Sequence, residues 1–148
     1  MIQDTPKDRL QRHLGLLRGC AGWTAEVFAN KLEVSRATVS TLEKDGHELT
    51  MMQYLAIRKL YEDEITRSAD DTNMLASVLK VVVDNPDDYT EEEKKEVLDK
   101  ARLMAPTVIR VPSERKSMNN AWKALLAASG VIATAALVAV VFGKSKDD

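Results

Sequence analysis

Hydrophobic residues recur at helical spacing through the first sixty residues, and short polar breaks separate the periodic stretches. Leu10, Leu14 and Leu17 form an apolar stripe on one face of a helix, which Gly19 and Gly22 end. Further short helices are predicted where Thr24 and Ser35 can cap the helical N-terminus, and another helix is predicted from about Thr50 to Tyr61. The pattern predicts an N-terminal unit made of helices.

The second and third predicted helices are separated by a tight turn. The second carries Val27, Phe28 and Leu32 on its inner face, and the third, over residues 35–44, places Val39 and Leu42 toward the same core. Two short helices joined in this way have helix-turn-helix geometry.

Residues 70–105 continue the helical pattern as an acidic extension. An apolar stripe over 74–82 ends in a turn at Pro86, and Thr90 with Glu93 forms a capping box that opens another helix. These helices form either a partner-binding or dimer-forming hairpin or an extension packed on the N-terminal unit. The second interpretation is favoured because a single pair of helices rarely holds a core alone.

The longest apolar run lies near the C-terminus. Residues 124–142 carry no charge, and at the helical rise they cover about 29 Å, which matches the hydrocarbon core of a bilayer. We therefore expect a linker over 106–120, a transmembrane helix over 121–142 and a short tail over 143–148. Trp122 is expected in the headgroup layer at the start of this span.

Charge is distributed in blocks along the chain. The net charge is -2, with +3 over residues 7–60, -7 over 61–109 and +3 over 110–123. The excess of basic residues before the span predicts a single-pass protein of the inner (cytoplasmic) membrane with a cytoplasmic N-terminus, and the lone Cys20 agrees with a reducing compartment. Small residues recur at a spacing of four along the span. This spacing is typical of helices that self-associate into a homodimer, but small residues are also common in transmembrane spans in general.

The run from Thr24 to Gly46 carries the most specific motif. It combines a small residue, a set of apolar residues, a serine cap and a Glu-x-x-Gly ending. At these positions the chain resembles the phage-repressor (Cro/cI, or XRE) helix-turn-helix family, and the resemblance covers residues 8–62. It implies an all-α, five-helix repressor-like domain. In that domain Ala29 is the small residue at the helix crossing, and Val34, Val39 and Leu42 belong to the shared core. Arg18 and Glu43 form a salt bridge between the first and third helices.

The resemblance also implies that the third helix enters the major groove of double-stranded DNA. The residues that this helix would present to base edges or phosphates are Arg36, Ala37, Thr38, Ser40, Thr41 and Lys44. Arg36 is the strongest candidate because a guanidinium can recognise guanine through two hydrogen bonds. The alternative interpretation is that Arg36 is an exposed surface charge with no role in base recognition. The expected function is a membrane-anchored, repressor-like transcriptional regulator.

Several departures from the family pattern keep a second function open. Ala25 stands where a polar phosphate-binding side chain is usual, Glu33 replaces the turn glycine, and His47 and Glu48 replace basic residues after Gly46. The alternative is a membrane-tethered scaffold whose helix-turn-helix domain binds a membrane or cytoskeletal protein, as in RodZ-like cell-shape proteins.

The sequence gives no support for catalysis. A chain of 148 residues holds about one ordinary domain with a short addition, which excludes a large multidomain enzyme. His13 and His47 have no nearby cysteine or carboxylate pair at metal spacing, and neither a glycine-rich phosphate loop nor a nucleophile motif is present. We expect no enzymatic activity, no cofactor and no metal site.

Overall fold

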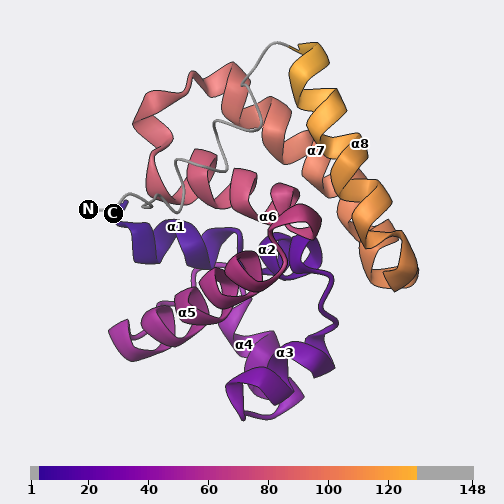
Figure 1. The fold of residues 1–148 in the computed structure, drawn as a ribbon. Coiled ribbons are helices and arrows are strands. Elements are labelled where there is room, and N and C mark those ends of the chain that lie inside the picture. The colour runs from indigo at the N-terminus through magenta and orange to yellow at the C-terminus, as the bar shows by residue number, and fades with distance from the viewer. Residues whose placement is uncertain (1–3, 130–148) are drawn as a thin grey trace, which may run out of the picture.

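A computed structural model describes residues 4–129, and over that range the regular elements are all helical (Figure 1). The α-helices are α1 (Pro6–Arg12), α2 (Leu14–Ala21), α3 (Ala25–Leu32), α4 (Arg36–Leu42), α5 (Met51–Arg67), α6 (Asn73–Val78), α7 (Glu91–Arg110) and α8 (Arg115–Ser129). A π-helical turn over Leu79–Asp84 extends α6. Other helices are joined by 3-10 turns over Ala69–Asp71, Pro86–Asp88 and Pro112–Glu114.

Local sequence explains where many of these helices begin. The predicted caps at Thr24, Ser35 and Thr90 each accept a hydrogen bond from the backbone N–H three residues on, and Thr50 caps α5 in the same way. The first apolar stripe is divided between two helices rather than one, because the backbone leaves helical geometry at His13. The predicted helix starts are confirmed, and the first helix is corrected to α1 and α2.

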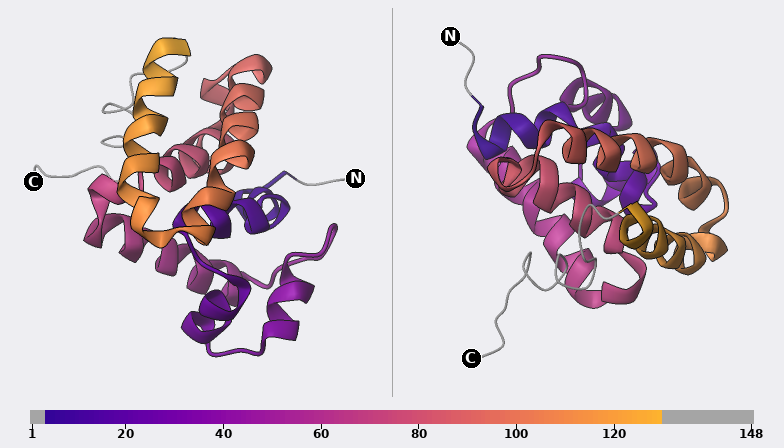
Figure 2. Two further views of the ribbon diagram at one scale, coloured as in Figure 1. Left: turned by 90° about the vertical axis from the view of Figure 1, so that its right-hand side faces the viewer. Right: turned by 90° about the horizontal axis from the view of Figure 1, so that it is seen from above.

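The helices are arranged around α6, which lies near the centre of the molecule (Figures 1 and 2). α2 contacts both α6 and α7, while α8 packs on α6 and α7. α3 and α4 lie at the lower end of Figure 1, and the C-terminal end of α8 lies at the opposite, upper end. The helix-turn-helix is therefore displayed away from the point where α8 ends.

A single hydrophobic core joins the N-terminal unit to the acidic extension. The rings of Trp23, Phe28 and Tyr61 stack with centroid separations of 5.5 to 6.2 Å, and they belong to the same cluster as Val97 of α7. Every residue from Thr72 to Val83 is buried, which requires neighbours on all sides of that segment. The extension is thus packed on the N-terminal unit, as the favoured interpretation held.

The expected linker over 106–120 is wrong. α7 continues through Pro106 to Arg110, and after one 3-10 turn α8 begins at Arg115. A proline inside a helix costs about 3 kcal/mol, but the apolar stripe of α7 continues past it to Val108, which is buried. Burial of that stripe therefore maintains the helix where the local signal favoured a break.

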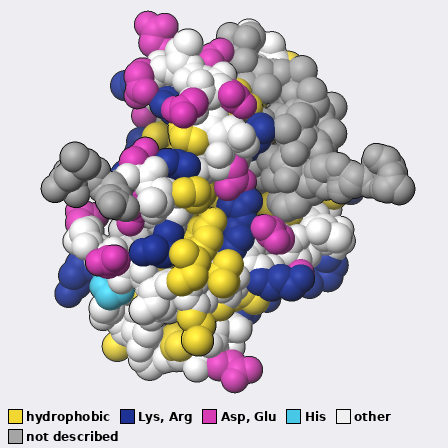
Figure 3. All heavy atoms as spheres, turned by 90° about the vertical axis from the view of Figure 1, so that its left-hand side faces the viewer, with side chains coloured by type: hydrophobic (Ala, Val, Ile, Leu, Met, Phe, Trp, Pro, Cys, Tyr) yellow, Lys and Arg dark blue, Asp and Glu magenta, His cyan; other side chains and the backbone are white. Residues whose placement is uncertain are grey.

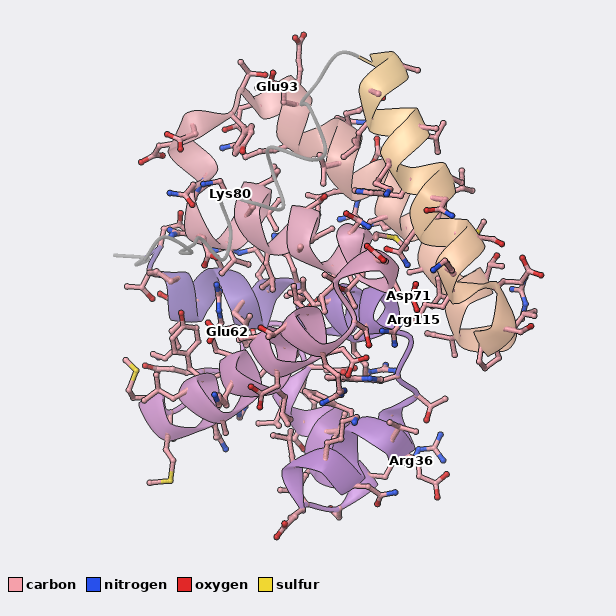
Figure 4. All side chains as sticks on the ribbon, in the orientation of Figure 1. Arg36, Glu62, Asp71, Lys80, Glu93 and Arg115 are labelled. Atoms are coloured by element: carbon pink, nitrogen blue, oxygen red, sulfur yellow. The ribbon has the colours of Figure 1, made fainter. Side chains whose placement is uncertain are left out.

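α8 is fastened to the rest of the domain by polar contacts at its first turns. Arg115 Nη2 lies 2.8 Å from Glu64 Oε2, and its Nε donates a hydrogen bond to the backbone carbonyl of Asp71 at 3.1 Å (Figure 4). Asn119 Oδ1 accepts a hydrogen bond from the backbone N–H of Met74 at 2.8 Å. These contacts place the start of α8 against both α5 and α6.

The predicted transmembrane helix over 121–142 begins on α8, but residues 130–142 and the tail over 143–148 lie outside the described part of the chain. Trp122, expected in the headgroup layer, is instead fully buried in the domain core, and so is Leu126. Among the described helices, none combines the length and the apolar character needed to cross a bilayer.

Candidate nucleic-acid interface

α3 and α4 pack on each other and are joined by a short turn, an arrangement consistent with a helix-turn-helix. Glu33 adopts φ 59°, a left-handed conformation that costs a residue with a side chain about 1–2 kcal/mol. The N–H of Val34 donates to the carbonyl of Ala29 at 3.0 Å, and Ser35 Oγ accepts from the N–H of Thr38 at 3.0 Å. The turn therefore forms with glutamate at the position where the Cro/cI family usually has glycine.

The residues implied as structural by the resemblance divide into two groups. Ala29, Val39 and Leu42 are buried between α3, α4 and the rest of the core. Val34 is 37% exposed, so its expected place in the shared core is wrong, and so is the inward position expected for Val27 on α3, which is 40% exposed. Val34 lies in the turn, outside both helices, and its side chain is not carried on either packed face.

Arg18 and Glu43 form the ion pair that the resemblance implies. Arg18 Nε donates to Glu43 Oε2 at 2.6 Å and Nη2 to Oε1 at 3.2 Å, while Nη1 donates to the carbonyl of Trp23 at 3.1 Å. A Cβ built at Gly15 would lie 3.5 Å from Glu43 Oε1, an ordinary van der Waals contact, so this position lies directly beside the carboxylate. Two hydrogen bonds from one guanidinium to one carboxylate fix both the distance and the relative orientation of the two side chains. This ion pair therefore holds the end of α4 against α2.

The residues predicted to read DNA lie on the outward face of α4, except Lys44, which follows the end of the helix. All are exposed except Thr38, which is half-buried: Arg36, Ala37, Thr38, Ser40, Thr41 and Lys44. The hydroxyl of Thr41 donates to the carbonyl of Ala37 at 3.2 Å, and those of Thr38 and Ser35 lie 2.9 Å apart. Within the described residues no hydrogen bond or ion pair engages Arg36, which projects from the end of the molecule (Figure 4).

The charge around α4 is mixed. Arg36 and Lys44 are exposed cations at α4, and Lys31 is an exposed cation on the neighbouring α3. Exposed carboxylates lie on the neighbouring helix, in the turn and in the loop after α4: Glu26, Glu33, Asp45 and Glu48. Because affinity for a duplex rises with the number of phosphates that basic residues neutralise, one copy of this surface has only a weak electrostatic attraction for DNA.

An apolar patch at the start of α5 was not singled out from the sequence. Met51, Met52 and Leu55 are 56%, 80% and 57% exposed, and Figure 3 shows apolar side chains gathered on this side of the molecule. The signal was present in the helical period, because Ile57 and Tyr61 define the buried face four residues apart and the patch falls on another face. Exposed apolar patches often mark contacts with other molecules.

The described residues hold little else that suggests chemistry. Among them, no group of three or more His, Cys, Asp or Glu side chains could hold a metal ion. Burial raises the pKa of the Cys20 thiol to about 12, so the reactive thiolate is not formed at neutral pH.

Comparisons of the chain with protein-family models, with characterised proteins and with solved structures found no match. Membership of the Cro/cI family remains a prediction, which rests on the residues and the helix arrangement given above.

Proposed function

We propose that the protein is a membrane-anchored DNA-binding regulator that reads operator DNA with α4. The observation that carries the proposal is the outward face of α4, which is exposed at one end of the molecule with Arg36 unengaged by the described residues. A guanidinium near the start of such a helix can donate two hydrogen bonds to guanine in the major groove.

The position of α8 supports anchoring at the inner membrane. The uncharged run over 124–142 begins on this helix, whose C-terminal end lies opposite α3 and α4 (Figures 1 and 2). With the part of that run beyond Leu126 in the bilayer and the N-terminus in the cytoplasm, α4 faces away from the membrane. DNA can then approach α4 without contact between the duplex and the lipid surface.

Pairing of two chains completes the proposal. The mixed charge around α4 limits the phosphate contacts that one copy can make. Two copies on a pseudo-palindromic site double those contacts, and helix-turn-helix dimers read half-sites about one helical turn of DNA apart.

The test is selection of bound sequences from random duplex DNA by the full-length chain in a nonionic detergent, at low salt. We expect enrichment of a two-fold related site. Arg36→Ala should cost about 1–3 kcal/mol of discrimination at one base position while retaining most of the non-specific affinity. Lys100→Ala is the matched control, because Lys100 pairs with Glu96 within α7 and lies outside the α4 face.

The whole chain is needed for this experiment. A protein cut after residue 105 would lose Val108 and Trp122, both buried in the core, and its failure to bind would say nothing about α4. Absence of any enriched sequence with the full-length chain would contradict the proposal.

The apolar patch formed by Met51, Met52 and Leu55 favours one second candidate, a membrane-tethered scaffold that binds a protein partner, as RodZ-like proteins do. A photo-crosslinking residue at Met52 in cells should then give one discrete adduct. The same residue at Lys59, also exposed on α5, should give none. A discrete adduct together with a negative DNA selection would favour the scaffold over the regulator.

A further inference from the structure

A cleft of about 440 Å³ opens between α1 and the N-terminal half of α7. Residues of both helices line it, together with Val82 and Pro86, and none of its lining residues belongs to α4. Its volume falls within the range of small-molecule sites. The cleft is thus a second concave surface, separate from the candidate DNA interface.

The lining of this cleft has an excess of positive charge. The cations come from both helices and outnumber the carboxylates by five to three: Arg9, Arg12, Lys94, Lys95 and Arg102 against Asp4, Glu91 and Asp99. The excess of two charges stands out because residues 61–109, which include α7 almost entirely, are strongly acidic as a whole. The acidic extension therefore turns several of its few basic residues toward one cleft.

Two of the carboxylates are each shared between cations. Asp4 lies 3.3 Å from Arg9 Nη1 and 3.0 Å from Arg12 Nη2, while Asp99 Oδ1 lies 3.4 Å from Arg102 Nη1 and its other oxygen binds a lysine. Among the described residues Arg12 and Arg102 each donate one hydrogen bond, although a guanidinium has five N–H donors. Their remaining donors are available to an anion in the cleft.

His13 is half-buried and lines the same cleft as these two arginines. Burial is the main cause that lowers its pKa to about 4, and the charges of Arg12 and Arg102 lower it further, while Asp4 acts in the opposite direction. The imidazole is therefore neutral at neutral pH among positive charges. An anion bound beside it would offset those charges and raise the pKa of His13.

We propose that the cleft between α1 and α7 binds a phosphate monoester. Guanidinium groups on two different helices suit a tetrahedral dianion, which accepts several charge-assisted hydrogen bonds and balances the excess of two positive charges. Val82 and Leu98 supply an apolar wall for the carbon part of the ester. This site goes beyond the proposed function, because it gives the domain a ligand input that does not involve α4.

The test follows His13 by NMR titration of the full-length chain in a nonionic detergent, with inorganic phosphate and glycerol 3-phosphate as probes. We expect a saturable rise in the pKa of His13 with both probes and none with chloride at the same ionic strength. Arg12→Gln and Arg102→Gln should each weaken binding about tenfold, since each removes a charge-assisted hydrogen bond. Lys59→Gln, an exposed residue of α5 outside the cleft, is the control.

Vesicles distinguish the two sources of a phosphate monoester. If the ligand is a lipid headgroup, phosphatidylcholine vesicles containing phosphatidate should shift the pKa of His13. The phosphatidate concentration needed should be far below the glycerol 3-phosphate concentration that produces the same shift. If it is a soluble metabolite, the vesicles should have no such advantage.

Two results would overturn the proposal: no saturable shift with any probe, or equal weakening in Lys59→Gln. If Arg12→Gln fails to fold, Lys94→Gln at the same cleft takes its place.

Discussion

Trp122 donates its indole N–H to Ser77 Oγ at 3.0 Å, and both residues are fully buried. This bond joins the last described helix, α8, to the central helix α6. Leu126, one turn further along α8, is also fully buried. α8 is therefore part of the folded domain, although its sequence merges into the uncharged C-terminal run.

Replacement of this indole should destabilise the domain. Trp122→Phe leaves the Ser77 hydroxyl without its partner and opens a small space, and we expect a loss of about 1–3 kcal/mol in the free energy of unfolding. Urea denaturation followed by circular dichroism measures it. Leu125→Ala, on the more exposed side of the same helix, should change stability by only about 0.5 kcal/mol. Equal effects would mean that α8 is not docked.

Two glycines with the same backbone conformation should respond differently to alanine. Gly22 and Gly46 have φ of 82° and 81°, so either substitution incurs about 1 kcal/mol of left-handed strain. At Gly22 the new Cβ would also lie 3.0 Å from Cγ1 of Val108 on α7, whereas nothing lies within 4 Å at Gly46. We expect Gly22→Ala to lose about 1–3 kcal/mol more than Gly46→Ala. Equal losses in thermal unfolding would argue against the close packing of α2 on α7.

Stability should fall as the solution is acidified, in a window set by His13. The pKa of its imidazole is lowered from 6.5 to about 4 in the folded protein, so between these values the unfolded chain binds a proton that the folded chain does not. The free energy of unfolding should therefore decrease by up to about 3 kcal/mol as the pH falls from 7 to 4.

His13→Gln isolates this contribution, because Asp4, whose pKa is lowered by Arg12 and Arg9, also loses stabilisation in acid. The difference in unfolding free energy between His13→Gln and the unaltered protein should change across this pH range. A constant difference would show that His13 titrates in the folded protein as it does in the unfolded chain.

Glu33 offers a substitution that should improve both stability and DNA binding. Glu33→Gly removes the left-handed strain at φ 59° and a negative charge beside α4, and we expect a gain of about 0.5–1 kcal/mol in the free energy of unfolding. Glu33→Ala removes the charge but keeps most of the strain. If the proposed function is right, both variants should bind DNA more tightly, and only Glu33→Gly should also be more stable.

Local signals in the sequence predicted the helix starts correctly, since a cap such as Ser35 or Thr90 depends on residues within one turn. They failed where distant packing decides the outcome. Pro106 reads as a break, yet the helix continues because Val108 is buried against other helices. The family resemblance implied a core position for Val34, but its place in the turn leaves it exposed.

The same division holds for the candidate sites. The exposed face of α4 could be found from helical period and family resemblance, because its residues are close together in the chain. The cleft between α1 and α7 could not, since Arg12 and Arg102 stand ninety positions apart and no spacing rule connects them. Only the folding of α7 onto the N-terminal unit brings their charges together.

The stretch from Thr72 to Val83, buried at every position, sets a limit on how this chain can change over generations. A surface helix accepts drift on its outer side, but this segment has no outer side, and each replacement there must fit the neighbours already in place. Among descendants of a common ancestor, we expect these central positions to diverge most slowly, and α4 to diverge faster as it adapts to new partners.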